Sequence, residues 1–158
     1  MNYQYDSVFN GNSEVLLNPC NCQPTLYWGT HVSEYIYKHA GMMVRQERRG
    51  HGYLELGKYC VTSGGCLKHR TILHIAVLNA MSFDIRYLFK LSKRISAITM
   101  ELTMESIQKY CEENNIDKID VPVFWSGKNG WSDHEFEGKF NDHPAIQYMC
   151  IYKNLPKH

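Results

Sequence analysis

Two glycines flank a lysine and an asparagine in the segment WSGKNGWSDHE, which follows the apolar run IDVPVF. Gly127 and Gly130 allow backbone amides to point inward together, and Ser132 is placed to cap a following helix. Amides that converge beside the positive end of a helix can hold phosphate oxygens without a basic surface. A glycine pair after a strand is more often a simple turn, because Gly and Asn are the commonest turn residues. On this segment alone both interpretations stay open.

A second polar segment, NPCN, follows the apolar run Glu14–Leu17. Its asparagines, Asn18 and Asn21, lie three residues apart in the sequence. They could offer amide groups to a sugar hydroxyl, or each could close an Asx turn with the backbone. The chain continues through Gly29 and Thr30 into a predicted helix, so this segment also has the order strand, loop, helix.

The cysteines and a central histidine do not form a metal pattern. Cys20 and Cys22 are separated by one residue, and no downstream Cys or His pair at zinc spacing accompanies them. We expect no metal site, and free, mostly buried thiols in a reducing compartment. His74 stands in the buried pattern TILHIAVLN, where a hydrogen-bonded core histidine is commoner than a metal ligand.

Alternating strands and helices must position these loops. Strands are expected at Glu14–Leu17, in LGKYCVTSGG and TILHIAVLN, in IDVPVF, and from Ile146 to Tyr152. One helix is expected in VSEYIYKHAG, with Val32, Tyr35, Ile36 and His39 on one face, and another from Ser96 with a stripe of Ala97, Met100, Met104, Ile107 and Cys111. The polar stretch RQERRGHG is expected to form a solvated surface. This order predicts an α/β layered domain with ligands beyond the carboxyl ends of its strands.

Composition excludes several classes of protein. The chain has 158 residues, which predicts one domain over 1–158, and its formal charge is only +1. Near-balanced charge argues against direct nucleic-acid binding, because backbone binding needs a basic groove. No apolar run has the length of a spanning helix, and the start lacks the features of a signal peptide. We therefore expect a soluble, cytoplasmic protein without membrane association.

Four segments in register give a family resemblance that covers nearly the whole chain. VLLNPCN is similar to the strand of the macro domain family that ends in two asparagines, and GTHVSEYIYKHAG is similar to its glycine-rich loop and helix. LELGKYCVTSGGCLKHRTILHIAV and IDVPVFWSGKNGW resemble the family's later strands and its second phosphate loop. The resemblance implies a three-layer α/β/α fold with a central mixed sheet that binds ADP-ribose or ADP-ribosylated macromolecules, without a cofactor.

The resemblance also implies a set of site residues. Asp6 matches the aspartate that accepts a hydrogen bond from adenine, and Tyr152 is placed like the residue that packs on adenine. Asn21 matches the asparagine that contacts the distal ribose, while Asn18 matches one that supports the loop. The two phosphate loops correspond to Gly29, Thr30, His31 and Val32, and to Ser126, Gly127, Lys128, Asn129, Gly130 and Trp131.

Two departures from the family pattern affect the expected activity. The usual glycine run is replaced by Trp28, Gly29, Thr30 and His31, whose bulk could narrow the distal-ribose pocket. Hydrolytic members often have an aspartate after the loop valine, where this chain has Ser33, which cannot serve as an ionised base at neutral pH.

The resemblance therefore leaves two functions in view. One is hydrolysis of a distal-ribose linkage, as an ADP-ribosyl hydrolase or ADP-ribose 1″-phosphate phosphatase, with Asn21 and His31 as the catalytic residues. The other is non-catalytic reading of ADP-ribose. His31 is the candidate acid or base, because histidine is the side-chain type suited to proton transfer at neutral pH, although a solvent-exposed loop histidine is an equally good interpretation. The third interpretation, a single-strand nucleic-acid binder that uses its aromatic rings, is disfavoured by the balanced charge.

Overall fold

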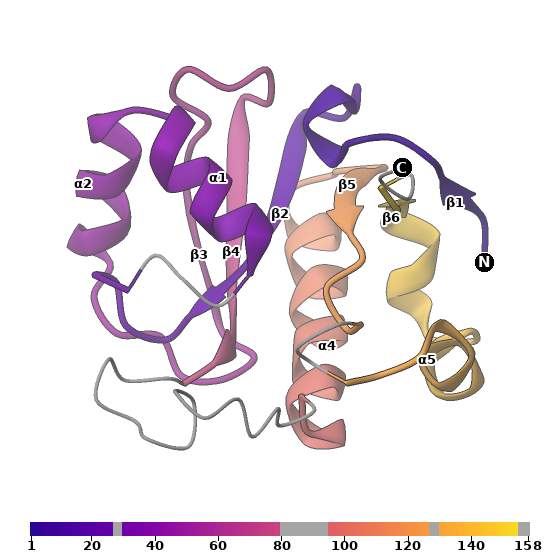
Figure 1. Ribbon diagram of the computed structural model, residues 1–158. Coiled ribbons are helices and arrows are strands. Elements are labelled where there is room, and N and C mark those ends of the chain that lie inside the picture. Colours follow the sequence, from indigo (N-terminus) through magenta and orange to yellow (C-terminus); the bar gives the residue numbers. More distant parts are fainter. Residues whose placement is uncertain (27–29, 80–94, 127–129, 155–158) are drawn as a thin grey trace.

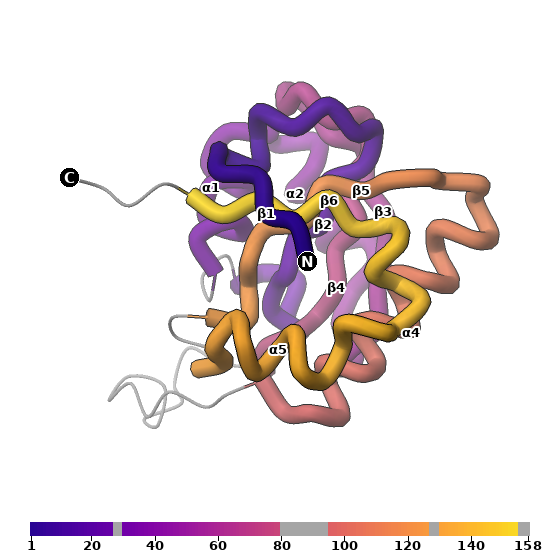
Figure 2. Tube along the Cα trace, turned by 90° about the vertical axis from the view of Figure 1, so that its right-hand side faces the viewer, coloured from indigo at the N-terminus to yellow at the C-terminus, as the bar shows by residue number. Residues whose placement is uncertain are grey.

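The computed structural model describes residues 1–26, 30–79, 95–126 and 130–154 (Figure 1). Its centre is a six-stranded sheet in the order β1-β6-β5-β2-β4-β3. All neighbouring pairs are parallel except β3 with β4, so the sheet is mixed. The strands are β1 (Tyr3–Gln4), β2 (Val15–Asn21), β3 (Tyr59–Ser63), β4 (Thr71–Leu78), β5 (Ile119–Pro122) and β6 (Met149–Tyr152). Figure 2 shows that β1 lies beside β6, so the first and last strands share one end of the sheet.

Helices cover both faces of this sheet, which confirms the predicted three-layer α/β/α arrangement (Figure 1). One face carries α1 (His31–His39) and α2 (Met42–Gly50), and the other carries α4 (Ala97–Glu113) and α5 (Asp133–Phe140). Two 3-10 helices, η1 (Val8–Asn10) and η3 (Pro144–Tyr148), connect elements near β1 and β6. None of the described helices combines the length and apolar composition needed to cross a bilayer.

The central strand β2 is buried on both faces because its side chains alternate between the two layers. Val15 and Leu17 pack into the larger hydrophobic cluster with α4 and α5. Leu16 packs into a second cluster with Ile36 of α1 and Val44 of α2. Burial on both sides explains why this strand has a continuous apolar run instead of an alternating pattern.

A polar chain of hydrogen bonds crosses the sheet on the α1 and α2 side. The Asn18 amide donates to Nδ1 of His74 over 2.9 Å, and Nε2 of His74 lies 2.8 Å from the Thr62 hydroxyl. The Thr62 hydroxyl in turn donates to the Ser63 carbonyl. Burial, with a smaller contribution from the Arg48 charge, lowers the pKa of His74 to about 3. His74 is therefore a neutral, hydrogen-bonded core residue, as predicted.

Most of the predicted elements are present, with four differences. The segment NPCN was expected to be a loop after a strand ending at Leu17, but strand β2 continues through it to Asn21. The stretch RQERRGHG was expected to be solvated surface, but most of it belongs to α2, where Arg48 is fully buried. Helix α1 buries Ser33, Ile36 and Tyr37, while Tyr35 of the expected apolar stripe is 41% exposed. The last strand starts at Met149 because Pro144 begins a 3-10 turn.

Stability should therefore depend on pH through His74. In the unfolded chain this histidine has an ordinary pKa near 6.5, whereas in the folded protein its pKa is about 3. The unfolding free energy is therefore unaffected by His74 above pH 6.5. It decreases as the pH falls from 6.5 toward 3, because only the unfolded chain then takes up a proton at His74. Between pH 7.5 and 5 we expect the wild-type protein to lose about 2 kcal/mol more unfolding free energy than His74→Gln, measured by urea denaturation. Parallel pH profiles of the two proteins would contradict this.

Candidate functional site

Parallel pairing brings the ends of several strands to one edge of the sheet. Strands β2, β4, β5, β6 and β1 all run in the same direction, so their carboxyl ends meet there. The loop after β2 leads into α1, and the loop after β5 leads into α5. The helix amino termini therefore lie next to the strand ends, as in open α/β sheets that bind ligands at this edge.

Thr30 joins the first loop to the end of β2. Its hydroxyl donates to the Pro19 carbonyl over 2.8 Å and accepts from the Ser33 amide over 3.0 Å. As the N-cap of α1, it places the first turn of this helix against the central strand. The amides of that turn carry the positive end of the helix dipole and suit an anion.

The neighbours of Thr30 in this loop face different surroundings. Val32 packs against the cluster that holds Leu16 and Ile36. The His31 side chain is 96% exposed, and its Nδ1 lies 4.0 Å from a Glu34 carboxylate oxygen. In the described structure the His31 side chain is therefore exposed to solvent, which was one of the two interpretations that the sequence allowed.

The two asparagines of NPCN have different roles in the structure. Asn18 is buried and bonded to His74, which suits the expected supporting role. Asn21 is also buried, at the last position of β2, and its side-chain oxygen accepts from the Gln23 amide over 3.1 Å. This contact is an Asx turn, and Asn21 makes further interactions besides.

A short backbone bridge closes the second loop at its base. The Trp131 amide donates to the Trp125 carbonyl over 2.7 Å. Next to it, Gly130 has φ +79°, in the left-handed region that favours glycine. Ser126 is exposed at the start of the loop. Gly127, Lys128 and Asn129 of this loop, like Gly29 of the first, lie outside the described residues.

The two tryptophans anchor this bridge in the core. Trp125 stacks on Phe136 with ring centroids 3.8 Å apart, and its indole nitrogen donates to an Asp133 carboxylate oxygen over 3.0 Å. Trp131 is buried, and its indole nitrogen donates to the Ile95 carbonyl over 2.6 Å. The buried ring of Trp131 thus anchors the end of the bridge at which the described chain resumes, and its predicted part in ligand binding stays a prediction.

Helix α5 begins with a complete capping box directly after the loop. The Ser132 hydroxyl accepts from the Glu135 amide, and the Glu135 carboxylate accepts from the Ser132 amide. Ser132 is therefore the N-cap, as predicted from the sequence. Both loops of the candidate site consequently end at a helix whose first turn is capped by a hydroxyl.

The residues predicted to contact adenine lie at the carboxyl ends of β1 and β6, whereas the two loops follow β2 and β5. Asp6 is exposed, and its carboxylate accepts from the Ser7 amide over 2.7 Å and from the Asn10 side chain over 3.0 Å. Tyr152 is partly buried against the cluster that includes Val32. Burial, and after it the Asp120 charge, raises the pKa of Tyr152 well above its usual value, so this phenol is neutral.

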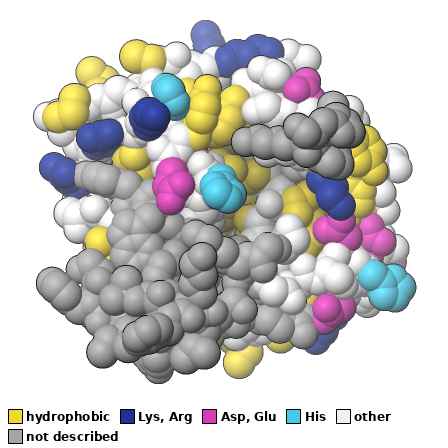
Figure 3. Space-filling view, in the orientation of Figure 1, with side chains coloured by type: hydrophobic (Ala, Val, Ile, Leu, Met, Phe, Trp, Pro, Cys, Tyr) yellow, Lys and Arg dark blue, Asp and Glu magenta, His cyan; other side chains and the backbone are white. Residues whose placement is uncertain are grey.

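Sequence reasoning missed a pair of aromatic rings beside this region. Phe9 and Tyr35 stack with ring centroids 4.0 Å apart, and Phe9 packs against the same cluster as Tyr152 and Val32. Figure 3 shows the face of the molecule that is seen in Figure 1, where hydrophobic side chains lie near the centre and the visible Lys and Arg side chains are dispersed. Tyr35 was placed only on one face of a predicted helix and Phe9 in no predicted element, so nothing in the sequence indicated that the two rings meet.

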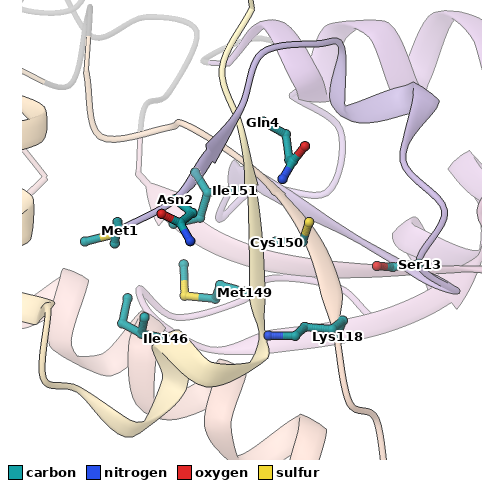
Figure 4. Close-up of a pocket in the computed structure, with 9 residues that line it drawn as sticks. All are labelled: Met1, Asn2, Gln4, Ser13, Lys118, Ile146, Met149, Cys150 and Ile151. Carbon is teal, nitrogen blue, oxygen red and sulfur yellow. The ribbon is translucent and has the colours of Figure 1, made fainter.

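A separate hollow of about 480 Å³ lies near the amino ends of the strands (Figure 4). Its lining includes Ser13, which precedes β2, and Lys118, which precedes β5, together with Cys150 and Gln4. None of the predicted site residues lines it, so it is distinct from the two loops.

In the described part of the chain, no three His, Cys, Asp or Glu side chains are grouped to hold a metal ion. Four cysteines are buried and free, namely Cys20, Cys22, Cys60 and Cys111.

Comparison with known proteins relates both the sequence and the architecture to one family. A family model described as Macro domain matches residues 17–137. No curated protein sequence matches the chain. Among solved structures, the macrodomain of Mycobacterium tuberculosis DarG has a TM-score of 0.71 and 16% identity, and the match covers 98% of this chain and 97% of that one.

Two further structures of this kind contain nucleotides. An Oceanobacillus iheyensis macrodomain with ADP has a TM-score of 0.69 and 14% identity, with 97% of this chain and 82% of that chain covered. A Trypanosoma brucei macrodomain in complex with ADP-ribose has a TM-score of 0.67 and 17% identity, with coverage of 95% and 61%. At such identities these structures establish a similar fold.

The Thr30 contacts give a stability prediction for the first loop. Thr30→Ala removes the cap of α1 and the bond to Pro19, so we expect the unfolding free energy to fall by about 1 kcal/mol. Thr30→Ser keeps the hydroxyl and should stay within about 0.5 kcal/mol of the wild type. Urea denaturation of the three proteins provides the measurement. Equal losses in both variants would show that the hydroxyl is not what matters.

Proposed function

The chain belongs to the macro domain family, and from this premise we propose that it binds ADP-ribose or ADP-ribosyl groups at the carboxyl edge of its sheet. The observation that carries the proposal is the pair of strand, loop and helix units that meet there. Each unit ends in a hydroxyl-capped helix amino terminus, at Thr30 and at Ser132. Two such termini can share one diphosphate without a basic surface, which agrees with the formal charge of +1.

The ligand would lie along this edge from Asp6 and Tyr152 to Asn21. In this arrangement the Asp6 carboxylate accepts from the adenine amino group, and the Tyr152 ring packs on the base. Backbone amides of Thr30, His31 and Val32 and of the loop between Trp125 and Trp131 hold the diphosphate. The Asn21 amide meets the distal ribose. Bound ADP and ADP-ribose in the O. iheyensis and T. brucei macrodomains support this choice of ligand class.

We further propose hydrolysis of the linkage at the distal ribose. A water attacks the anomeric carbon, or the terminal phosphorus of a 1″-phosphate, and the bond from that atom to the leaving group breaks. His31 takes the proton of the water or supplies one to the leaving group. Its exposed side chain, with Glu34 as its carboxylate neighbour, is free to turn toward a bound ribose. Orientation of the ribose by Asn21 would supply part of the rate enhancement.

One observation favours the second candidate function, a non-catalytic reader of ADP-ribose. Ser33 is buried and its hydroxyl has no hydrogen-bond partner among the described residues. A serine in this setting cannot act as an ionised base at neutral pH. Calorimetry with ADP-ribose tests binding, and release of ADP-ribose together with the freed acceptor or with phosphate from modified substrates separates the enzyme from the reader.

Asn21→Ala distinguishes these functions quantitatively. ADP-ribose affinity should fall by about 0.5–1.5 kcal/mol, the value of one hydrogen bond, while ADP affinity stays unchanged because ADP lacks the distal ribose. If the protein is an enzyme, turnover should fall far more than affinity, since loss of orientation acts mainly on the transition state. Equal affinity of the unmodified protein for ADP and ADP-ribose would show that the distal ribose is not recognised.

Tyr152 provides a matched test of the adenine end. Tyr152→Ala removes the ring and should weaken ADP-ribose and ADP binding equally, by about 1 kcal/mol or fivefold. Tyr152→Phe keeps the ring and should bind both ligands as the wild type does. Calorimetry measures all of these affinities. Normal binding by a folded Tyr152→Ala protein would place the base elsewhere.

A further inference from the structure

Arg48 is a fully buried cation whose partners lie at the end of the central strand. It belongs to α2, where the next residue, Arg49, is exposed. One terminal nitrogen of Arg48 donates to the Gly52 carbonyl over 2.6 Å. The other lies 3.3 Å from the carbonyl oxygens of both Asn21 and Cys22. The guanidinium therefore ties the carboxyl end of α2 to the last residues of β2.

The side chains around Arg48 do not neutralise its charge. Burial raises the pKa of the Cys20 thiol to about 12, although the nearby guanidinium acts in the opposite direction, and burial also raises the pKa of Cys22 and Cys60. His74 is neutral as well. In the part of the chain that the structure describes, Arg48 has no carboxylate within ion-pair distance. Among the described residues, the backbone carbonyls of Gly52, Asn21 and Cys22 and the neutral Cys20 thiol receive this buried charge.

Stability by itself does not account for such a residue. Removing a guanidinium from water is expensive, and an apolar side chain of similar volume often stabilises a core equally well or better. The specific geometry that a guanidinium imposes is its distinguishing property, because its planar donors fix several acceptors at once. The carbonyl groups that accept from Arg48 therefore identify the part of the backbone that this side chain holds in place.

The end of β2 needs an additional support at this point. The register between β2 and β4 shifts between Cys20 and Asn21, so the ladder is irregular there, and Asn21 pairs with Leu78 beyond the shift. Beyond the shift, the Cys22 amide donates to the Leu78 carbonyl, and the Cys22 carbonyl accepts from the Leu54 amide. Arg48 is the side chain that holds the Asn21 and Cys22 carbonyls together, next to the Asx turn of Asn21.

We propose that Arg48 is a positioning residue that fixes Asn21 and thereby the distal-ribose half of the binding site. This inference rests on the proposed function for its effect on ligands. Arg48 contacts the end of β2 and not the residues assigned to adenine, so its influence should be confined to ligands that carry the distal ribose.

The ligand experiment compares ADP-ribose with ADP by calorimetry. Arg48→Met keeps the volume and removes the donors, and it should weaken ADP-ribose binding about fivefold while ADP binding changes less than about twofold. Arg49→Met is the matched control, because it removes the same charge from the neighbouring exposed position, and it should change neither affinity. If Arg48 contributed only to overall stability, Arg48→Met would lose affinity for ADP-ribose and for ADP to the same extent, and that outcome would overturn the proposal.

A double-mutant cycle tests whether Arg48 acts through Asn21. If it does, Arg48→Met should cost little further ADP-ribose affinity in an Asn21→Ala background, because the group that it positions is already absent. Additive losses would show that Arg48 acts by another route. The Arg48→Lys variant, which keeps the charge and fewer donors, should lie between wild type and Arg48→Met, and it serves as the test variant if Arg48→Met does not fold.

A ligand-free measurement separates this inference from the proposed function. The Gln23 amide is bonded to the Asn21 side chain, so its hydrogen exchange reports on the turn. Exchange at Gln23 should be faster in Arg48→Met or Arg48→Lys than in wild type, and unchanged in Arg49→Met. Unchanged exchange in both Arg48 variants would overturn the positioning role. Faster exchange in a protein that binds no ADP-ribose would keep that role and reject the proposed function.

Discussion

The hydroxyl of Thr30 connects the central strand to the helix that follows it, and much of the candidate site depends on this contact. Pro19 has no amide to donate, but its carbonyl is available and accepts from Thr30, which also caps α1 through Ser33. One side chain thus sets both the position and the first turn of the helix. Because α1 also packs on β2 through Ile36 and Leu16, the amides of its amino terminus stay fixed beside the strand end.

The second loop reaches an equivalent position by different means. Its two ends are joined by the bridge from Trp131 to Trp125, and each ring is fixed by its own hydrogen bond and by packing. Asp133, which accepts from Trp125, also forms a 2.6 Å ion pair with Lys153 just beyond β6. The loop after β5 is therefore tied to the chain that follows Tyr152. Two loops whose described ends are held in this way, each leading into a capped helix amino terminus, can bind an anion while the chain keeps nearly balanced charge.

Buried polar groups under α1 and α2 give this side of the sheet a defined arrangement. The order Asn18, His74 and Thr62 requires His74 to be neutral, with Nδ1 accepting and Nε2 donating. Arg48 lies nearby and reaches the end of the same strand. Such groups contribute little net stability, because their desolvation offsets much of the attraction, but each tolerates only one geometry. They specify where β2 ends and how Asn21 is presented.

The sequence by itself determined the elements whose signals are local. Apolar runs predicted β4 and the first part of β2, methionines at helical spacing predicted α4, and Ser132 after the glycine loop predicted the capped start of α5. Motifs in register also indicated the family, and they led to the proposal that the site lies at the carboxyl edge of the sheet. These properties follow from backbone geometry and from side chains close together in the chain, so they can be read without knowing the fold.

Tertiary structure alone decided which side chains those elements bury. Helix α2 is rich in charged residues and has little apolar signal, and only its packing against β3 and the end of β2 makes Arg48 a core residue and leaves Arg49 outside. The buried face of α1 centres on Ser33 and Ile36 because the cap at Thr30 sets the rotation of the helix. The stacking of Phe9 on Tyr35 and the contact of Asn18 with His74 join distant parts of the chain. Such pairings depend on strand order and register, which local sequence does not encode.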